Sequence, residues 1–335
     1  MDIFGRNKLH VQCFTKNRCA FRTNRHHAPL AIAKLSCNRR DRSNPEWVEI
    51  VASLVSRVFI GHKSPKARGF FIDDVNNHFV NADVFMESKN ECLLNSSNGA
   101  PAVGGVLIPY SNVVSHMDTL LVDSCSVQMQ NPVHTTVEWI LDNLFEIHDR
   151  SCRANVFFDP DTGEKVLLDF DTFRSKREFC QGRIFPQIIR PSFLDTSFHH
   201  TKIVSRQKAR INDWVYCSLL RRGRSMMMSA LTNFEEKKVA FDDLLKKDQW
   251  FRSVLPKVLD RKLNCSRSNT KSQGACFVRE DLYINSFDQS CLPDRCIGKG
   301  RQWMAICVIQ EVIFRRLYGL MIGMRKTYAE LCPKK

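Results

Sequence analysis

The sequence predicts an α+β protein, with strands and helices mixed in the first part of the chain and helices dominating from Trp214 onward. Short apolar or alternating runs bounded by turn residues are typical of strands, and they lie in the first part. Later segments, among them residues 239–245 and 303–320, place their apolar residues at helical spacing. The length of 335 residues allows one large two-lobed domain or two ordinary domains, and no internal repeat is visible.

Three segments of the first part have strand patterns. Residues 9–14 alternate between apolar and polar side chains, as a half-buried strand does. Residues 30–35 form an apolar run that carries one lysine, Lys34, which indicates a buried strand. Residues 103–108 form a third apolar run. The polar stretch of residues 61–100 is expected to be irregular.

Two segments of the first part have the pattern of amphipathic helices. Asn44, Pro45 and Glu46 are typical of a helix start, because Asn caps, Pro suits the first helical position and an acid suits the first turn. The apolar residues that follow at helical spacing are Trp47, Ile50, Val51, Leu54, Val55 and Val58. They predict a helix that packs one face on the core. Residues 135–147 show the same spacing.

A β-hairpin is the sharpest local prediction. Residues 156–158 and 166–168 are short apolar runs joined by a segment rich in turn residues. Asn155 opens the first strand and Asp169 closes the second, so antiparallel pairing brings them to the same end. Asp149 lies just before them, at the end of the preceding helix. These three oxygen-bearing side chains suit a Mg²⁺ site, and the alternative is that they are caps and turn residues.

Composition and charge narrow the class of protein. Apolar residues make up 43% and charged residues 25% of the chain, which excludes wholesale disorder. The net charge of +15 favours acidic partners: a nucleotide, a phosphate-bearing substrate, nucleic acid or an anionic surface. No leader is visible, and polar residues interrupt the apolar segment 303–320, so we expect no membrane association.

The fourteen cysteines are scattered from Cys13 to Cys332. A chain of this length does not need disulfides to stabilise a small core, and the spacing of the closest pairs does not match a zinc site. We therefore expect reduced thiols and an intracellular protein, cytoplasmic or nuclear.

The order of these segments resembles that of the eukaryotic protein kinase family. Residues 30–34 resemble the strand whose lysine, here Lys34, grips the nucleotide phosphates. The helix that follows takes the place of the helix whose glutamate pairs with that lysine, and Glu49 or Glu46 is available for this pairing. Residues 106–110 are placed like the hinge between the two lobes.

Later motifs of the family follow in the same order, so that the resemblance covers about residues 1–220. Asp149, preceded by a histidine, and Asn155 resemble the catalytic loop. Residues 168–171, Leu-Asp-Phe-Asp, resemble the Asp-Phe-Gly metal site. Residues 212–214, Asn-Asp-Trp, resemble the Asp-x-Trp at the start of the central helix of the large lobe.

The resemblance implies a single bilobal domain of the protein-kinase-like fold. Residues 1–108 would form a small, mainly β N-lobe with one helix, and residues 109–335 a larger, mainly helical C-lobe. It also implies ATP-dependent phosphoryl transfer to Ser or Thr hydroxyls of a protein substrate, with ATP and Mg²⁺ as cofactors.

A role for each site residue follows from the resemblance. Lys34 would neutralise the nucleotide phosphates and be held by Glu49. Asn155 and Asp169 would hold Mg²⁺. Asp149 would orient the attacking hydroxyl and accept its proton.

Three features depart from the family pattern. The glycine-rich loop is missing, and Gly5, which we assign to the nucleotide site, is the only glycine before Gly61. Asp149 precedes Asn155 by six residues, one more than in the family, and Asp171 replaces the last glycine of Asp-Phe-Gly. Three further functions stay open: a pseudokinase scaffold that binds nucleotide or protein without transfer, a small-molecule phosphotransferase, and a basic nucleic-acid-binding protein.

Overall fold

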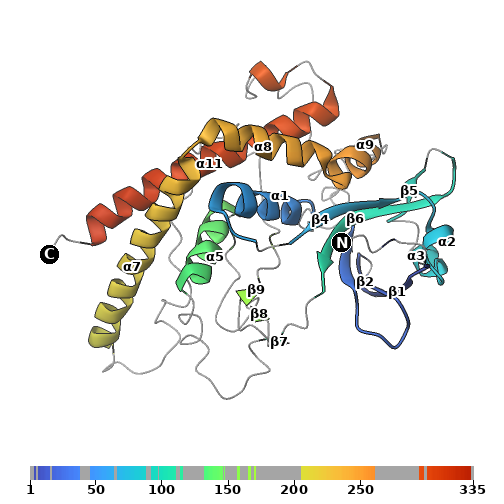
Figure 1. The fold of residues 1–335 in the computed structure, drawn as a ribbon, viewed down its shortest axis with the longest axis horizontal. Coiled ribbons are helices and arrows are strands. Elements are labelled where there is room, and N and C mark those ends of the chain that lie inside the picture. Colours follow the sequence, from blue (N-terminus) through green and yellow to red (C-terminus); the bar gives the residue numbers. More distant parts are fainter. Residues whose placement is uncertain are drawn as a thin grey trace, which may run out of the picture.

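The structure is a computed structural model in which an antiparallel sheet near the N-terminus precedes a mostly helical remainder (Figure 1). This arrangement confirms the α+β class. The residues that the structure describes are 4, 7–15, 17–37, 46–63, 66–87, 92–96, 98–110, 114–115, 132–145, 147, 157–158, 165–166, 170, 205–260, 294–297 and 300–332.

The N-terminal sheet has the strand order β1-β2-β3-β6-β4, and each neighbouring pair is antiparallel. Its strands are β1 (His10–Thr15), β2 (Arg18–Arg22), β3 (Ala31–Leu35), β4 (Arg68–Ile72) and β6 (Pro101–Pro109), and the short β5 (Leu94–Asn95) also pairs with β6. The three strands that the sequence predicts are β1, β3 and β6, and all three are confirmed.

An aromatic core covers one face of this sheet. The ring of Phe21 on β2 lies 5.7 Å from that of Phe70 on β4 and 5.0 Å from that of Phe79. Two short helices, α2 (Val75–His78) and α3 (Asp83–Glu87), contribute to the same region. The expectation that residues 61–100 are irregular is therefore wrong. Elements this short, one of them a strand containing a glycine, are too brief to show a clear period.

Helix α1 (Val48–Val55) lies on the other face of the sheet, and every one of its residues is buried. It continues as a π-helical turn, η1 (Ser56–Ile60), which ends at Gly61 with a φ of 74°, a left-handed conformation that favours glycine. The cap position of α1 is Trp47, so the helix begins later than the predicted start at Asn44, which lies outside the described residues.

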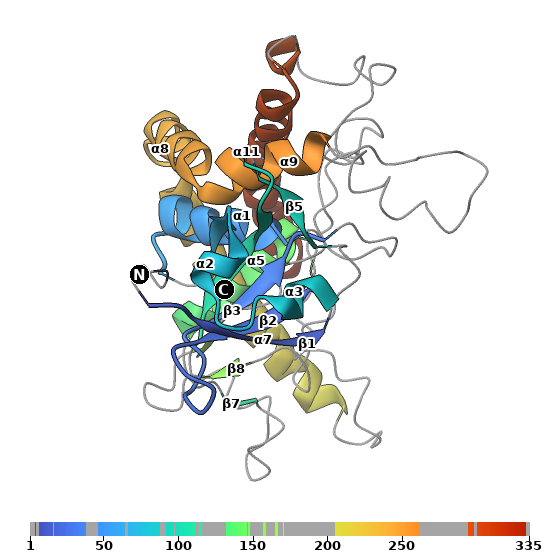
Figure 2. The same ribbon diagram turned by 90° about the vertical axis from the view of Figure 1, so that its right-hand side faces the viewer.

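The remainder is mostly helical. Its elements are α5 (Pro132–Phe145), α7 (Ser205–Leu231), α8 (Phe234–Lys247), the π-helical turn η5 (Trp250–Val254), α9 (Leu255–Asp260), the 3-10 turn η8 (Asp294–Cys296) and α11 (Arg301–Leu331). In both ribbon views α8 and α9 lie above α1 and α5 lies below it (Figures 1 and 2). Helix α1 is thus enclosed by the sheet and by helices from the distant half of the chain.

The predicted hairpin is confirmed in its pairing. Strands β8 (Phe157–Phe158) and β9 (Lys165–Val166) are antiparallel, with Phe157 opposite Val166, and β7 (Val114–Ser115) extends them to a small second sheet.

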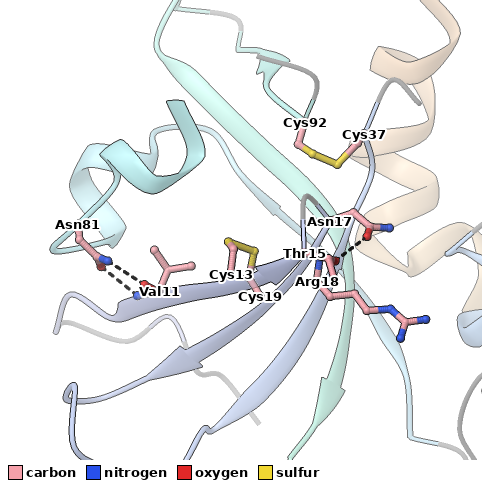
Figure 3. Close-up of a disulfide and its surroundings, with 9 residues drawn as sticks. All are labelled: Val11, Cys13, Thr15, Asn17, Arg18, Cys19, Cys37, Asn81 and Cys92. Atoms are coloured by element: carbon pink, nitrogen blue, oxygen red, sulfur yellow. Dashed lines mark hydrogen bonds between the residues drawn. A yellow bond between two sulfur atoms is a disulfide. The ribbon is translucent and has the colours of Figure 1, made fainter. Parts of the chain in front are cut away.

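Disulfides join all eight cysteines among the described residues. The pairs are Cys13–Cys19, Cys37–Cys92, Cys217–Cys332 and Cys296–Cys307. Figure 3 shows the first pair bridging opposite positions of β1 and β2, and the second joining the chain after β3 to the chain before β5. The expectation of reduced thiols is therefore wrong for these cysteines, because folding brings residues together that are as much as 115 positions apart.

A search of the described helices finds none with the length and apolar character that crossing a bilayer requires.

Candidate functional site

A buried ion pair between Lys34 and Glu49 is the centre of the candidate site. Lys34 Nζ lies 2.5 Å from Glu49 Oε1, and the two side chains are 11% and 1% exposed. The sequence left Glu46 and Glu49 as alternative partners of Lys34, and the structure selects Glu49.

The strand pattern explains how Lys34 reaches helix α1. Ala31, Ala33 and Leu35 point to the aromatic core on one face of the sheet. Because side chains alternate along a strand, Lys34 points to the opposite face, where α1 lies. Glu49 is in the first turn of α1, where the helix dipole favours an acid.

Burial of this pair is unfavourable in itself. Removing two charges from water costs several kcal/mol for each ion, on the order of what their attraction returns, so a hydrophobic pair would serve stability as well. A lysine and a glutamate held this way between a strand and a helix therefore indicate a functional role more than a stabilising one.

A third segment meets the pair. The backbone N–H of Phe170 donates to Glu49 Oε1 at 3.2 Å, and that N–H belongs to the peptide bond that joins Phe170 to Asp169. Phe170 is fully buried, and its ring lies 5.8 Å from that of Phe145 at the end of α5. One carboxylate oxygen thus links segments 15 and 121 residues away from Glu49.

The second oxygen of Glu49 has no hydrogen-bond partner among the described groups. Glu49 Oε2 is buried and unsatisfied, whereas buried carboxylate oxygens are ordinarily hydrogen-bonded. An orphaned acceptor beside a buried ammonium is the observation that fits a site which binds a further polar group.

Glu46 has a different set of partners. It accepts hydrogen bonds from the Ser36 hydroxyl and, at 3.3 Å, from Trp250 Nε1. Burial raises the pKa of the Glu46 carboxyl, and the bonds from Ser36 and Trp250 and the charge of Lys34 oppose this shift. Glu46 therefore belongs to a contact between β3, α1 and the distant Trp250, and not to the ion pair.

The remaining predicted site residues lie outside the described residues. These are Gly5, Asp149, Asn155 and Asp169. Within the described part of the chain no group of three or more His, Cys, Asp or Glu residues is placed to hold a metal ion.

The predicted helix start at residues 212–214 is wrong. Helix α7 begins at Ser205, so Asp213 and Trp214 lie within the helix, and Trp214 is 72% exposed. Trp214 lines a cavity of about 200 Å³ between α5 and α7, together with Leu219 and Arg222. Lys34, Glu49 and Phe170 do not line this cavity, so it is separate from the candidate site.

Two contributors were missed by sequence reasoning. Arg18 begins β2 and lies opposite Lys34 in the strand register, so both side chains are on the same face of the sheet. The strand pattern of residues 18–22 could have revealed it. Trp250 bonds to Ser36, which lies 214 residues earlier in the chain, and no local sequence pattern indicates such a contact.

No family model, curated protein or solved structure matches the chain. No function is therefore transferred to this chain from a known protein, and the proposed function rests on the chemistry of the chain's own residues.

Proposed function

We propose that the chain is a divergent protein kinase that transfers a phosphoryl group from ATP to Ser or Thr hydroxyls of a protein substrate. The observation that carries the proposal is the Lys34–Glu49 ion pair together with the bond from the Phe170 amide to the same Glu49 oxygen. A lysine on the third strand paired with a glutamate on the following helix is a requirement of kinase catalysis, and the metal-binding aspartate has to be in place beside it.

The residues have distinct roles in this proposal. Glu49 orients Lys34, which binds the phosphates of the nucleotide as a point charge. Asp169 and Asn155 would hold Mg²⁺, which supplies charge neutralisation when bound. Asp149 would orient the substrate hydroxyl and take up its proton.

Arg18 could bind phosphate in place of the missing glycine-rich loop. Backbone amides of that loop ordinarily cover the phosphates, and here the corresponding β1–β2 hairpin is bridged by Cys13–Cys19 (Figure 3). Arg18 stands at the start of β2, exposed and in register with Lys34. A guanidinium at this position can bind a phosphate in a bidentate manner and so take the place of backbone amides.

A pseudokinase scaffold is the second candidate. The bridged hairpin without glycines favours it, because a hairpin closed by a disulfide adjusts less to a nucleotide than a glycine-rich loop does. A small-molecule phosphotransferase is a third candidate. A basic nucleic-acid-binding protein is a fourth, on the net charge of +15.

The test is MgATP binding by calorimetry, followed by radiolabelled phosphate transfer to a generic basic protein. We expect binding and transfer by the wild-type chain. Asp169→Asn should abolish transfer with a change in melting temperature of only a few degrees, since the change is near-isosteric and is expected to cost about 1 kcal/mol or less. Asp149→Asn should reduce transfer and spare binding. Asp243→Asn, an exposed acid on α8, is the matched control and should change neither.

Three other outcomes would each identify a competing function, and a fourth would contradict the proposed catalytic residues. Binding without transfer identifies the scaffold, and transfer to a small molecule but not to protein identifies the phosphotransferase. Absence of nucleotide binding together with salt-sensitive binding of DNA or RNA identifies the nucleic-acid-binding protein. Full transfer by both aspartate variants contradicts the proposed catalytic residues.

The four disulfides bear on the cellular compartment in which the protein acts. An intracellular protein, cytoplasmic or nuclear, was expected on the argument that the thiols are reduced, and four disulfides remove that argument. Disulfides persist in oxidising compartments, and we propose such a compartment as the place where this protein acts. Alkylation of the native protein before mass analysis should leave the eight paired cysteines unmodified. Alkylation of all eight would restore the cytoplasmic or nuclear assignment.

A further inference from the structure

A short segment from the distant half of the chain contacts the elements that carry the ion pair. This docking segment, residues 248–254, includes the π-helical turn η5 and contacts β4 and β6 of the sheet. It follows α8, the helix that lies along α1 (Figure 1). The docking segment is separated from Lys34 by more than two hundred residues, yet one of its side chains bonds to the chain next to Lys34.

Trp250 bonds to residues that flank the two elements of the ion pair. Its indole Nε1 donates to Ser36 Oγ at 2.9 Å and to Glu46 Oε1 at 3.3 Å, and the Ser36 hydroxyl in turn donates to Glu46. Ser36 comes two residues after Lys34, directly after the last residue of β3. Glu46 comes three residues before Glu49 and directly before Trp47, the cap of α1. The three-residue node of Ser36, Glu46 and Trp250 therefore ties β3 to α1 within one turn of the ion pair.

Polar bonds fix the docking segment on the edge strand of the sheet. Asp248 accepts from the backbone N–H of Gly69 at 2.9 Å and from the backbone N–H of Trp250 at 2.9 Å. Gln249 Nε2 donates to the backbone oxygen of Phe71 at 3.1 Å. These bonds hold the backbone that carries Trp250 against β4.

Two glycines give the docking segment its close approach. A β-carbon on Gly69 would overlap Asp248 Oδ1 and the backbone nitrogen of Trp250, and a β-carbon on Gly104 of β6 would overlap the Val254 side chain. Both strands therefore lack a side chain where the docking segment lies against them, and a larger residue at either glycine would displace the segment.

We propose that Trp250 is a positioning residue: through the node it holds β3 and α1 at the spacing at which Lys34 and Glu49 stay paired. The docking segment thus contributes to the ion pair from the distant half of the same chain. The consequence for catalysis rests on the proposed kinase function, whereas the effect on the ion pair does not. Trp250 is 1% exposed, and a purely apolar role at this site could be filled by phenylalanine, which has no N–H to donate.

The test removes the N–H donor of Trp250 and keeps an aromatic ring at this position. Trp250→Phe is compared with wild type by the rate at which an amine-acylating reagent modifies Lys34, followed by mass spectrometry of the peptide. We expect Lys34 to react on the order of threefold to tenfold faster, because the variant loses the single N–H that bonds to both Ser36 and Glu46 and so weakens the equilibrium that pairs Lys34 with Glu49. Exposed lysines such as Lys326 should keep their rates and serve as an internal reference.

The matched control is Trp47→Phe. Trp47 is equally buried and its ring lies 6.4 Å from that of Trp250, but this change leaves the three bonds of the node in place. It should leave the Lys34 rate within about a factor of two of wild type, while its melting temperature reports the cost of losing an indole. If Trp250→Phe does not fold, Ser36→Ala removes the hydroxyl from the node and should raise the Lys34 rate in the same way.

The outcomes separate the two proposals. An unchanged Lys34 rate in a folded Trp250→Phe or Ser36→Ala protein overturns the positioning role, and so does an equal rise in Trp47→Phe. Protection of wild-type Lys34 by MgATP is measured in parallel. If the variant raises the Lys34 rate but MgATP gives no protection to wild type, the positioning role stands and the kinase function fails.

Discussion

Helix α1 is held by different contacts at its two ends. At the N-terminal end Glu46 is bonded to Ser36 and Trp250, and Glu49 is bonded to Lys34 and the Phe170 amide. At the C-terminal end, where the π-helical turn η1 continues the helix, Phe59 packs in an aromatic cluster. Its ring lies between 5.6 and 6.1 Å from those of Phe234, Phe241 and Phe314.

The difference separates stability from position. Apolar contact is roughly proportional to the area removed from water and has no preferred direction, so the aromatic end stabilises the helix without fixing its register. Hydrogen bonds are directional and lose strength steeply when the angle worsens, so the polar end sets where Glu49 lies. A helix that has to bring one carboxylate to one ammonium needs both kinds of contact, and variants at the two ends should have different consequences.

The largest loss of stability should come from the apolar end. Phe59→Ala leaves a cavity among three phenylalanines, and we expect the free energy of unfolding to fall by about 3–5 kcal/mol. Acylation of Lys34 in the folded fraction should remain close to the wild-type rate, because the polar end is intact. Denaturant titration measures the first quantity and peptide mass analysis the second. A cost below about 1 kcal/mol would mean that α1 is not anchored by this cluster.

The next largest loss of stability is expected at the Lys34–Glu49 ion pair. Lys34→Met acts on a pair whose two partners are both buried. The variant leaves the Glu49 carboxylate buried without its cation, which should lower the free energy of unfolding by about 3 kcal/mol, the low end for a buried pair because Lys34 keeps some exposure. MgATP binding should be lost.

A double variant isolates the charge effect at this pair. Adding Glu49→Leu to Lys34→Met removes the unpaired carboxylate and should restore most of the stability while nucleotide binding stays absent. Additive losses in a double-mutant cycle would show that Lys34 and Glu49 do not interact.

Local patterns explain which parts of this arrangement could be predicted. Strand β3 is an apolar run with one lysine, and α1 shows apolar residues at helical spacing, so both elements and the candidate lysine follow from neighbouring residues. Glu46 and Glu49 could not be separated in this way. They are three residues apart and so lie on the same side of a helix.

Tertiary contacts decide between the two glutamates. Glu46 is occupied by Trp250, 204 residues later in the chain, and β4 depends on the same docking segment through Asp248. Information of this kind is absent from any short window of sequence. The disulfides were missed for the same reason. Cys37 and Cys92 are 55 residues apart, and nothing in that spacing indicates that they pair.

A smaller effect is expected where the docking segment meets the sheet. Gly69→Ala puts a methyl group into Asp248 and the Trp250 backbone, and overpacking of this kind costs about 1–3 kcal/mol. Because the methyl group displaces the docking segment, the Lys34 acylation rate should rise, as in Trp250→Phe. Gly99→Ala is the control for a glycine with open space around it, although its φ of 79° carries its own strain. A loss of stability without a rise in Lys34 reactivity would confine the role of Gly69 to packing.

The smallest effect should be the pH dependence of the polar end. Burial raises the pKa of Glu46 above its ordinary value of 4.5, so the folded protein holds this proton more tightly than the unfolded chain does. The stability that Glu46 contributes is therefore fully present below about pH 4.5 and is lost as the pH rises through the higher folded-state pKa. Glu46→Gln keeps an oxygen acceptor for Trp250 and Ser36 but does not titrate, so its melting temperature relative to wild type should increase from pH 4 toward neutrality. Glu236→Gln, an exposed glutamate on α8, controls for the change in net charge. A constant difference between Glu46→Gln and wild type across this range would mean that the Glu46 carboxyl is solvated, and the polar end of α1 would then be less enclosed than its bonds indicate.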